Sequence, residues 1–354
     1  MASEAAEGFE IVIVSAVALA RIREARFGTW DKNEPKDAQV ILFMLEQNIV
    51  QHYYDPLLAG THDLQELANK YFQITLARMR LQHSLMLHYI PLYFPEFACY
   101  WNATRSEWFI RFLLRFPAAR AIRALDFETF SHEAWDLIGR KVAKRAWLAE
   151  AYAMAAESIG LPVSLESSAI ETFRLQLSRY LELTLQRKQR DERAQQTLAA
   201  NPDFQRLQSL PGIGAILALT ILAEAGDLRR FNHHRQFLKY CGLDLAKIQS
   251  GQSRGHETLS KRGNKRLRMA FWMAALRAIH TRENAFRDKY ERYLADDPYD
   301  ADRKRKALTA VAAKMARVTY AVIKTGTDYQ RFFEHRVPGG SIPFTRAVEA
   351  TSTS

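Results

Sequence analysis

Three groups of residues in this chain have types and spacing suited to binding or attacking a charged substrate. Glu34 and Asp37 stand three residues apart at a predicted helix start, where both carboxylates face the same side. The turn Pro211–Gly214 joins two apolar helical runs, and residues 241–268 form a basic, glycine-interrupted stretch that contains three serines. The chemistries to weigh are therefore metal binding, phosphate binding and nucleophilic attack by a hydroxyl.

The turn lies within the sequence LQSLPGIGAILALTILAE, residues 207–224. Gly212 and Gly214 would let backbone N–H groups approach a phosphate closely, and the next helix adds the positive end of its dipole. These features predict a helix-hairpin-helix-like element that contacts a DNA backbone without reading its sequence. The alternative is a tight turn between helices that binds nothing.

The basic stretch has seven Lys and Arg residues from position 247 to 268, against the single acid Glu257. Such loops wrap phosphates, so we predict a loop that becomes helical only after Lys261. Taken alone, its serines are most simply turn or capping residues. The residues expected to contact DNA here are Lys247, Arg254, Lys261, Arg262, Lys265, Arg266 and Arg268.

The charge of the chain is unevenly distributed. Residues 1–200 contain 23 Lys and Arg against 24 Asp and Glu, whereas residues 201–354 contain 27 against 15. The net charge of +11 therefore resides in the C-terminal part, which favours a nucleic-acid-binding surface there. The alternative is a solvated basic face that only keeps the protein in solution.

Mostly helical elements must position these groups. Phe9 to Val17 (FEIVIVSAV) is the one convincing strand, and its four β-branched residues predict burial on both faces. A lone strand cannot pair the backbone N–H and C=O groups at its two edges. Its neighbouring strands are therefore expected to be missing from this sequence or to come from another chain. Pro35 and the residues from Asp37 to Gln47 predict a helix.

Two long amphipathic helices are expected further along. One carries the heptad-spaced positions Leu64, Leu67, Tyr71, Ile74, Leu81 and Leu85, with Arg78 in one core slot. It is expected to end at Pro91 and Pro95. The other carries Ile170, Phe173, Leu177, Leu181 and Leu185. The two could pair antiparallel as a coiled coil or dimerise between chains. Shorter helices are expected between them, with Ser131 as a candidate N-cap.

Composition excludes several classes of protein. No apolar run reaches the roughly 18 residues of a membrane span, and the acidic start is unlike a signal peptide. A cytoplasmic protein without a membrane partner is expected. Cys99 and Cys241 are the only cysteines, too few for a disulfide framework or a CxxC zinc site.

Five elements in order and spacing resemble one family. They are LPGIG, LTILAEAGDLRRF, YCGL (Tyr240 to Leu243), QSG (Gln249 to Gly251) and SKRGNKRLR, within roughly residues 204–280. They resemble the transposases of insertion sequence 110 and its relatives 116 and 902. A weaker resemblance covers WDKNEPKDAQVI, Trp30 to Ile41, which is similar to the family's D-x-x-D helix.

The resemblance implies a fold and a mechanism. Family members have a RuvC-like, RNase H-like N-terminal α/β domain with an Asp-Glu-Asp-Asp site for Mg²⁺. Their C-terminal domain carries a serine that attacks DNA covalently, and a structured guide RNA directs them. Carried over, the serine of the QSG element is Ser250, with Ser253 as the second candidate. Lys247, Arg254, Lys261 and Arg262 would stabilise the charge that develops during the attack.

The carboxylate set departs from the family pattern. Glu34 and Asp37 occupy the third and fourth acid positions, as catalytic and metal ligands, with Glu34 in place of Asp. The first acid, in a GIDVSK-like strand, and the second, in E-x-T-G, are absent. We therefore expect an incomplete metal site and an N-terminally truncated sequence. Without the resemblance, the two acids are most simply capping or surface carboxylates.

The expected organisation is mainly α, with four parts. Residues 1–97 form a partial RuvC-like domain with the start of a coiled coil, and residues 98–203 a helical or coiled-coil region. Residues 204–337 form the C-terminal transposase domain, and residues 338–354 a disordered tail. The expected protein binds DNA and guide RNA and forms a homo-oligomer through its coiled-coil helices. It is a transposase, or a catalytically inactive remnant of one; a helix-hairpin-helix repair accessory is a third reading.

Overall fold

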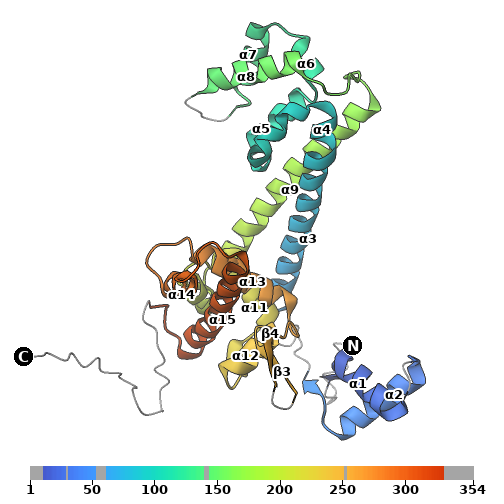
Figure 1. Ribbon diagram of the computed structural model, residues 1–354, viewed down its shortest axis with the longest axis vertical. Helices are drawn as coiled ribbons and strands as arrows, with labels where there is room; N and C mark the ends of the chain where they lie inside the picture. The colour runs from blue at the N-terminus through green and yellow to red at the C-terminus, as the bar shows by residue number, and fades with distance from the viewer. Residues whose placement is uncertain (1–10, 29–30, 53–60, 139–142, 251–252, 331–354) are drawn as a thin grey trace, which may run out of the picture. The chain divides into compact units, whose positions relative to one another are not determined.

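The computed structural model describes residues 11–28, 31–52, 61–138, 143–250 and 253–330 (Figure 1). Helices dominate these residues, so the mainly α fold is confirmed. The chain divides into two compact units, residues 1–65 and 66–354. No helix among the described residues is long and apolar enough to cross a membrane. The expected tail, residues 338–354, lies outside the described residues.

Before α3 (His62–Ser84) begins, the described residues of the first unit form two helices and one short strand pairing. Strand β1 (Val12–Ile13) pairs antiparallel with β2 (Gln51–His52). Helix α1 spans Ala16–Phe27 and α2 spans Glu34–Glu46. Asn33 caps α2 by accepting a hydrogen bond from the backbone of Lys36 at 2.9 Å, and Pro35 occupies its first turn. The helix start predicted at Pro35 is confirmed.

The strand predicted from Phe9 to Val17 is wrong in extent and in burial. The Ser15 hydroxyl accepts a hydrogen bond from the amide of Ala18, and this cap begins α1 at Ala16. The segment after it has good helix formers, which end the extended run early. Ile13 is 46% exposed, so this strand is not buried on both faces.

Two long helices of the second unit, α3 (His62–Ser84) and α9 (Ser168–Leu198), lie antiparallel within the chain (Figure 1). Arg187 donates to the Tyr71 hydroxyl at 2.8 Å near one end of the pair. The rings of Tyr89 and Phe173 stack near the other, with centroids 5.2 Å apart. Later residues of the first arm thus meet earlier residues of the second. Of the two arrangements left open by the sequence, the structure shows intramolecular antiparallel pairing.

Arg78 occupies its core slot because it has a partner there. Its guanidinium donates to the Tyr180 hydroxyl at 2.6 Å and lies 5.3 Å from the centre of that ring. On α9, Tyr180 is buried, at 1% exposed, whereas Leu185, one of the predicted core positions, is 56% exposed. The helical run continues past Pro91, because a π-helical turn, η2 (Leu85–Tyr89), leads into α4 (Ile90–Tyr93), whose first turn accepts the proline. It ends at Tyr93, so the expected stop is wrong at Pro91 and confirmed at Pro95.

Short helices between these arms enclose an aromatic core. They are η3 (Pro95–Arg105), α5 (Glu107–Arg115), α6 (Ala119–Arg123), α7 (Phe127–Trp135) and α8 (Lys144–Glu157). Phe97, Phe109, Phe112 and Phe130 are fully buried in this core. The Ser131 cap is wrong: Asp126 caps α7 through the Thr129 amide at 2.9 Å, and Ser131 lies inside the helix.

The C-terminal part of the second unit is helical apart from one hairpin. Its elements are α10 (Pro202–Gln208), α11 (Ala215–Ala225), η4 (Leu228–Arg230), α12 (His234–Cys241), β3 (Leu245–Ser250), β4 (Ser253–Leu259), α13 (Lys265–Ala278), α14 (Ala285–Leu294) and α15 (Ala301–Thr325). Buried side chains of α11, α13 and α15 form most of its core. The loop predicted before Lys261 is therefore wrong, because strand pairing satisfies its backbone groups.

Candidate nucleic-acid interface

The glycine turn joins α10 to α11, and Gly212 packs it onto α13. The φ angle of Gly212 is +89°, a conformation that other residues rarely adopt. A Cβ atom there would lie 2.3 Å from the carbonyl oxygen of Ala274 and 2.9 Å from the amide nitrogen of Ala278. Close packing between backbones therefore explains this glycine without a ligand.

Gly214 is different from its neighbour. It is exposed, its φ angle is −95°, and a Cβ atom would meet no atom within 4 Å. It is the N-cap of α11, and no side chain caps this helix. The first amides of α11 consequently lack a side-chain acceptor, which is the arrangement that an anion can complete.

Backbone pairing places Ser250 at the end of the β3–β4 hairpin. The register runs from Leu245 opposite Leu259, at the base, to Ser250 opposite Ser253. It shifts between Lys247 and Gln249, as in a β-bulge. The side chains of residues 246–257 lie outside the described ones, so Lys247, Ser250 and Arg254 are placed by backbone alone.

The base of the hairpin is fastened to α12 and α13. Ser260 donates from its hydroxyl to the Asp244 carboxylate, and its amide donates to the Asp244 carbonyl at 2.9 Å. Gly263, with φ +141°, lets the chain pass the Tyr240 carbonyl, where a Cβ atom would be only 2.5 Å away. The Asn264 amide donates to the same carbonyl at 2.7 Å. The segment between hairpin and α13 is thus held on the C-terminal end of α12.

The basic residues after the hairpin fall into two groups. Lys261, Arg262 and Lys265 are exposed. Arg266 instead forms an ion pair with Glu224 at 2.8 Å, and also contacts the Asn69 side chain and the Phe72 ring of α3. This guanidinium joins α13 to α11 and α3, which gives it a structural role.

Arg268 also has internal partners. Its guanidinium donates to the Lys261 carbonyl at 3.0 Å and to the Cys241 carbonyl at 3.4 Å. It lies where a Cβ atom on Gly242 would come within 2.4 Å of it. The exposed residues Lys261, Arg262 and Lys265 are therefore the cations of this segment best placed to face a phosphate.

The predicted DNA contacts do not form one cluster. Gly212 lies against Ala274 and Ala278, while Glu224, at the other end of α11, accepts from Asn264 at 2.7 Å. The two helices are thus antiparallel, and the glycine turn lies about 14 Å along α13 from its basic start. The exposed cations lie beside the base of the hairpin, whereas the glycine turn lies apart from them.

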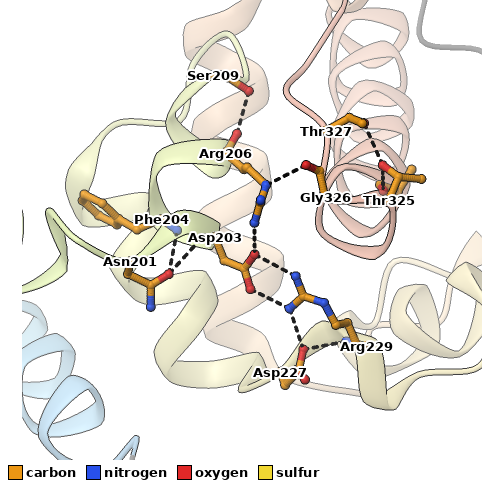
Figure 2. Close-up of polar contacts among 11 residues, drawn as sticks. Asn201, Asp203, Phe204, Arg206, Ser209, Asp227, Arg229, Thr325, Gly326 and Thr327 are labelled. Atoms are coloured by element: carbon orange, nitrogen blue, oxygen red, sulfur yellow. Dashed lines mark hydrogen bonds and ion pairs between the residues drawn. The ribbon is translucent and has the colours of Figure 1, made fainter.

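Two further arginines near the turn are engaged by carboxylates. Figure 2 shows Asp203 between Arg206, at 2.9 Å, and Arg229, at 2.6 Å, with Asp227 3.2 Å from Arg229. The hydrogen bond from Arg229 holds the pKa of Asp203 below its usual range, against the opposing effect of burial. Arg206 also donates to the Gly326 carbonyl at 3.0 Å. This network fastens α10 to η4 and to the end of α15.

Glu34 and Asp37 both lie in the first turn of α2, as predicted. Glu34 is exposed, whereas the Asp37 carboxylate pairs with Arg23 of α1, and these two side chains are 18% and 12% exposed. Within the described ranges, no group of three or more His, Cys, Asp or Glu side chains could hold a metal ion. The fit to a Mg²⁺ site is therefore poor in this part of the chain.

A basic pocket beside the hairpin was not predicted. It measures about 820 Å³ and is lined by α12, α14, α15 and the hairpin base. Four of its six α15 residues, Lys306, Ala310, Ala313 and Arg317, recur at helical spacing. That periodicity was the available signal, but it is equally typical of an ordinary solvent-facing helix edge.

Comparison with known proteins bears on residues 204–291, which match the model of the Transposase IS116/IS110/IS902 family. The transposase for insertion sequence element IS1111A of Coxiella burnetii is 31% identical over 140 residues, 40% of this chain and 38% of that protein. An uncharacterised protein of insertion element IS110 from Streptomyces coelicolor is 28% identical over 155 residues, 44% of this chain and 36% of that protein.

An uncharacterised protein of insertion element IS116 from Streptomyces clavuligerus is 26% identical over 137 residues, 39% of this chain and 33% of that protein. The matched segments thus span well under half the length of these relatives. Residues 204–291, which contain the glycine turn, the hairpin and the basic start of α13, therefore match the IS116/IS110/IS902 family of insertion-sequence transposases.

Proposed function

We propose that this transposase-family chain binds DNA with the exposed cations at the base of the β3–β4 hairpin, and that the hairpin carries the nucleophile Ser250. The observation that carries the proposal is the separation of the basic residues into engaged and exposed ones. Arg266 and Arg268 serve the fold, whereas Lys261, Arg262 and Lys265 face outward next to the hairpin. Exposed cations that have no structural task are the groups that can exchange counterions for phosphates.

A salt titration of the full chain tests the binding surface. Replacing Lys261, Arg262 and Lys265 with Gln removes three phosphate contacts, so the slope of log K against log salt falls by about three. Fluorescence anisotropy with a labelled duplex measures it. The matched control replaces three exposed arginines far from the hairpin in the sequence and should leave the slope unchanged. They are Arg120 of α6, Arg145 of α8 and Arg179 of α9. Equal slopes in the two triple variants would reject this surface.

The proposed chemistry at Ser250 is a transesterification. The Ser250 hydroxyl gives up its proton as its oxygen bonds to a DNA phosphorus. The bond from that phosphorus to an oxygen of one strand breaks, and this strand oxygen takes up a proton and becomes a hydroxyl end. Rejoining is the same step in reverse with another strand. The cations around the hairpin would stabilise the negative charge that develops on the phosphate oxygens.

Two-metal chemistry needs several converging carboxylates. The described residues supply Glu34 and Asp37, and Asp37 is paired with Arg23. These residues alone do not suit Mg²⁺, and we assign no step to a metal here. Cleavage by the family mechanism would need further carboxylate ligands. An inactive nucleic-acid-binding protein is accordingly the second candidate, favoured by the Arg23–Asp37 pair.

A denaturing gel with labelled DNA separates the two candidates. We expect the full chain, with or without Mg²⁺, to bind DNA without a covalent adduct, because the described carboxylates do not suit Mg²⁺ and the family's cleavage step would need further ligands. That outcome would support the proposed binding surface and favour the second candidate, the inactive protein. An adduct that Ser250→Ala removes would establish the active enzyme and overturn this expectation. An adduct that survives Ser250→Ala would instead show that the nucleophile is another residue, with Ser253 the next to test.

A further inference from the structure

The basic pocket has a charge imbalance that points to an anionic ligand. Three helices contribute cations: Arg235 and Lys239 of α12, Lys289 of α14, and Arg305, Lys306 and Arg317 of α15. Asp244 is the only carboxylate among the described lining residues, and it accepts a hydrogen bond from the Ser260 hydroxyl. Among the residues that the structure describes, only Arg305 of these six cations forms an ion pair, with exposed Asp302.

The same pocket also has apolar walls. Leu238, Leu243 and Leu259 line it, together with the small side chains of Ala310 and Ala313. A free inorganic anion would leave that surface without a partner. The ligand that fits both parts combines a flat apolar group with negative charge.

An aromatic side chain also lines the pocket. Tyr293 lines the pocket, is 45% exposed, and its ring centre lies 5.9 Å from the Lys289 ammonium. Aromatic rings beside cations are the usual platform for an unstacked base with its phosphate. The volume, about 820 Å³, is ample for one nucleotide and falls in the usual range of ligand pockets.

We propose that this pocket holds one unstacked nucleotide of a bound nucleic-acid strand, with the base against Tyr293 and the leucines and the phosphates on the surrounding cations. The inference rests on the proposed nucleic-acid binding and adds a defined subsite to it. The strand can be DNA or RNA, because both offer the same base and phosphate.

The pocket lies at the base of the hairpin, since Leu245 and Leu259, the first paired residues, belong to its wall. From Leu245 to Ser250 the strand extends over about 16 Å. The pocket therefore cannot hold the phosphate that Ser250 would attack. It would fix the position of the strand relative to the hairpin, as a positioning site.

The test uses the full chain and three labelled oligomers of equal length: oligo(dT), oligo(U) and a fully abasic deoxyribose-phosphate strand. Tyr293→Ala should weaken oligo(dT) or oligo(U) binding at least about fivefold, the lower range for loss of one stacked base. It should leave abasic binding unchanged. The matched control is Tyr299→Ala, which removes an 88% exposed tyrosine outside the pocket.

A second pair of variants tests the cations. Lys306→Gln with Arg317→Gln should weaken all three oligomers and lower the salt slope by about two. The control, Lys304→Gln with Arg277→Gln, removes equal charge from α15 and α13 outside the pocket. Because the replaced side chains are exposed, all of these variants should fold, and thermal melts check this.

The outcomes separate this inference from the function beneath it. If the unaltered chain binds neither duplex nor oligomers, the proposed function fails. If it binds and the pocket variants match their controls on both oligo(dT) and oligo(U), the function stands and the pocket is rejected. Equal weakening of abasic and base-bearing strands by Tyr293→Ala would also overturn the placement of the base. The oligomer that loses more affinity identifies the strand.

Discussion

The backbone of Gly212 passes so close to α13 that even a methyl group would collide with the Ala274 carbonyl oxygen, 2.3 Å from the added Cβ. Gly212→Ala would also force a β-carbon into a φ of +89°. We expect this variant to lose about 2 kcal/mol or more of folding stability, because strain and collision add. Thermal or urea unfolding measures the loss, and unchanged stability would mean that the turn packs differently.

Gly214 two residues later should respond in the opposite way. Its extended backbone, φ −95° and ψ −179°, suits a capping serine. Gly214→Ser should therefore keep or slightly raise stability, while its hydroxyl occupies the α11 amides and lowers DNA affinity a few-fold. Urea unfolding and DNA affinity, both measured for Gly214→Ser and the unaltered chain, test the two parts of this prediction. Full affinity in a stable variant would show that these amides do not bind phosphate.

Lys289 gives the pocket a pH dependence. Burial, reinforced by Arg317, Lys314 and Arg292, lowers the pKa of its ammonium group to about 8. Arg235 and Lys239 line the same pocket from α12, with Asp244 at the hairpin base. A bound phosphate favours the charged amine, so affinity for the oligomer that loses more in the pocket test should fall as pH rises through about 8. Lys289→Arg should remove this step, because a guanidinium stays charged.

The same shift has the opposite sign for folding. The pKa of Lys289 is lower in the folded chain than its ordinary value of 10.5, so the unfolded chain binds more protons between about pH 8 and 10.5. Without ligand, the contribution of this residue to stability therefore increases as pH rises through that window. From pH 7 to about 9.5, the urea-unfolding stability of the unaltered chain relative to Lys289→Arg should therefore rise, while its oligomer affinity relative to that variant should fall. Parallel changes would contradict the assignment to Lys289.

At the scale of elements, the antiparallel pair of α3 and α9 contains a polar contact, between Arg78 and Tyr180, in an apolar seam. Tyr180 is buried and its hydroxyl accepts from Arg78. Arg78→Leu would leave that hydroxyl without its partner, and Tyr180→Phe would leave the guanidinium without its acceptor.

A double-mutant cycle measures this contact. We expect each single change to cost about 1–2 kcal/mol and the double variant to cost less than the sum, with a coupling of about 1 kcal/mol. The control cycle combines Arg78→Leu with Tyr71→Phe. Tyr71 contacts Arg187 and not Tyr180, so the two effects should add. Additive effects at Arg78 and Tyr180 would mean that the contact does not stabilise the pair.

At the scale of the whole molecule, the second unit has two separate sets of buried residues. The first core is the cluster between Leu85 and Tyr180, and the second core runs from Ala194 to Ile323. Phe112 is fully buried in the first core and Phe271 in the second. Each Phe→Ala change should cost about 3–5 kcal/mol within its own core.

Their effects on binding should differ. The candidate interface draws on the second core, so Phe271→Ala should lower both the melting temperature of that part and DNA affinity. Phe112→Ala should lower only the stability of the first core and leave affinity unchanged below its transition. Calorimetry with anisotropy at one low temperature measures both. Loss of binding in Phe112→Ala would show that the first core contributes to the interface.

The sequence by itself determined what depends on local pattern. Apolar periodicity indicated the long helices, Pro35 marked the start of α2, and the order of motifs from LPGIG to SKRGNKRLR identified the family. Charge counting located the basic C-terminal part. These properties are carried by neighbouring residues, so they can be seen before any tertiary contact forms.

Tertiary structure decided what depends on contacts between distant residues. It separated Gly212 from Gly214, because only one of them meets α13. It distinguished Arg266, paired with Glu224, from exposed Lys265 one position earlier, although both read as phosphate contacts in the sequence. It made a hairpin of the expected loop and gathered the cations of three helices into one pocket. The physical reason is that burial and pairing of a side chain belong to its neighbours in space, which residue type and spacing do not specify.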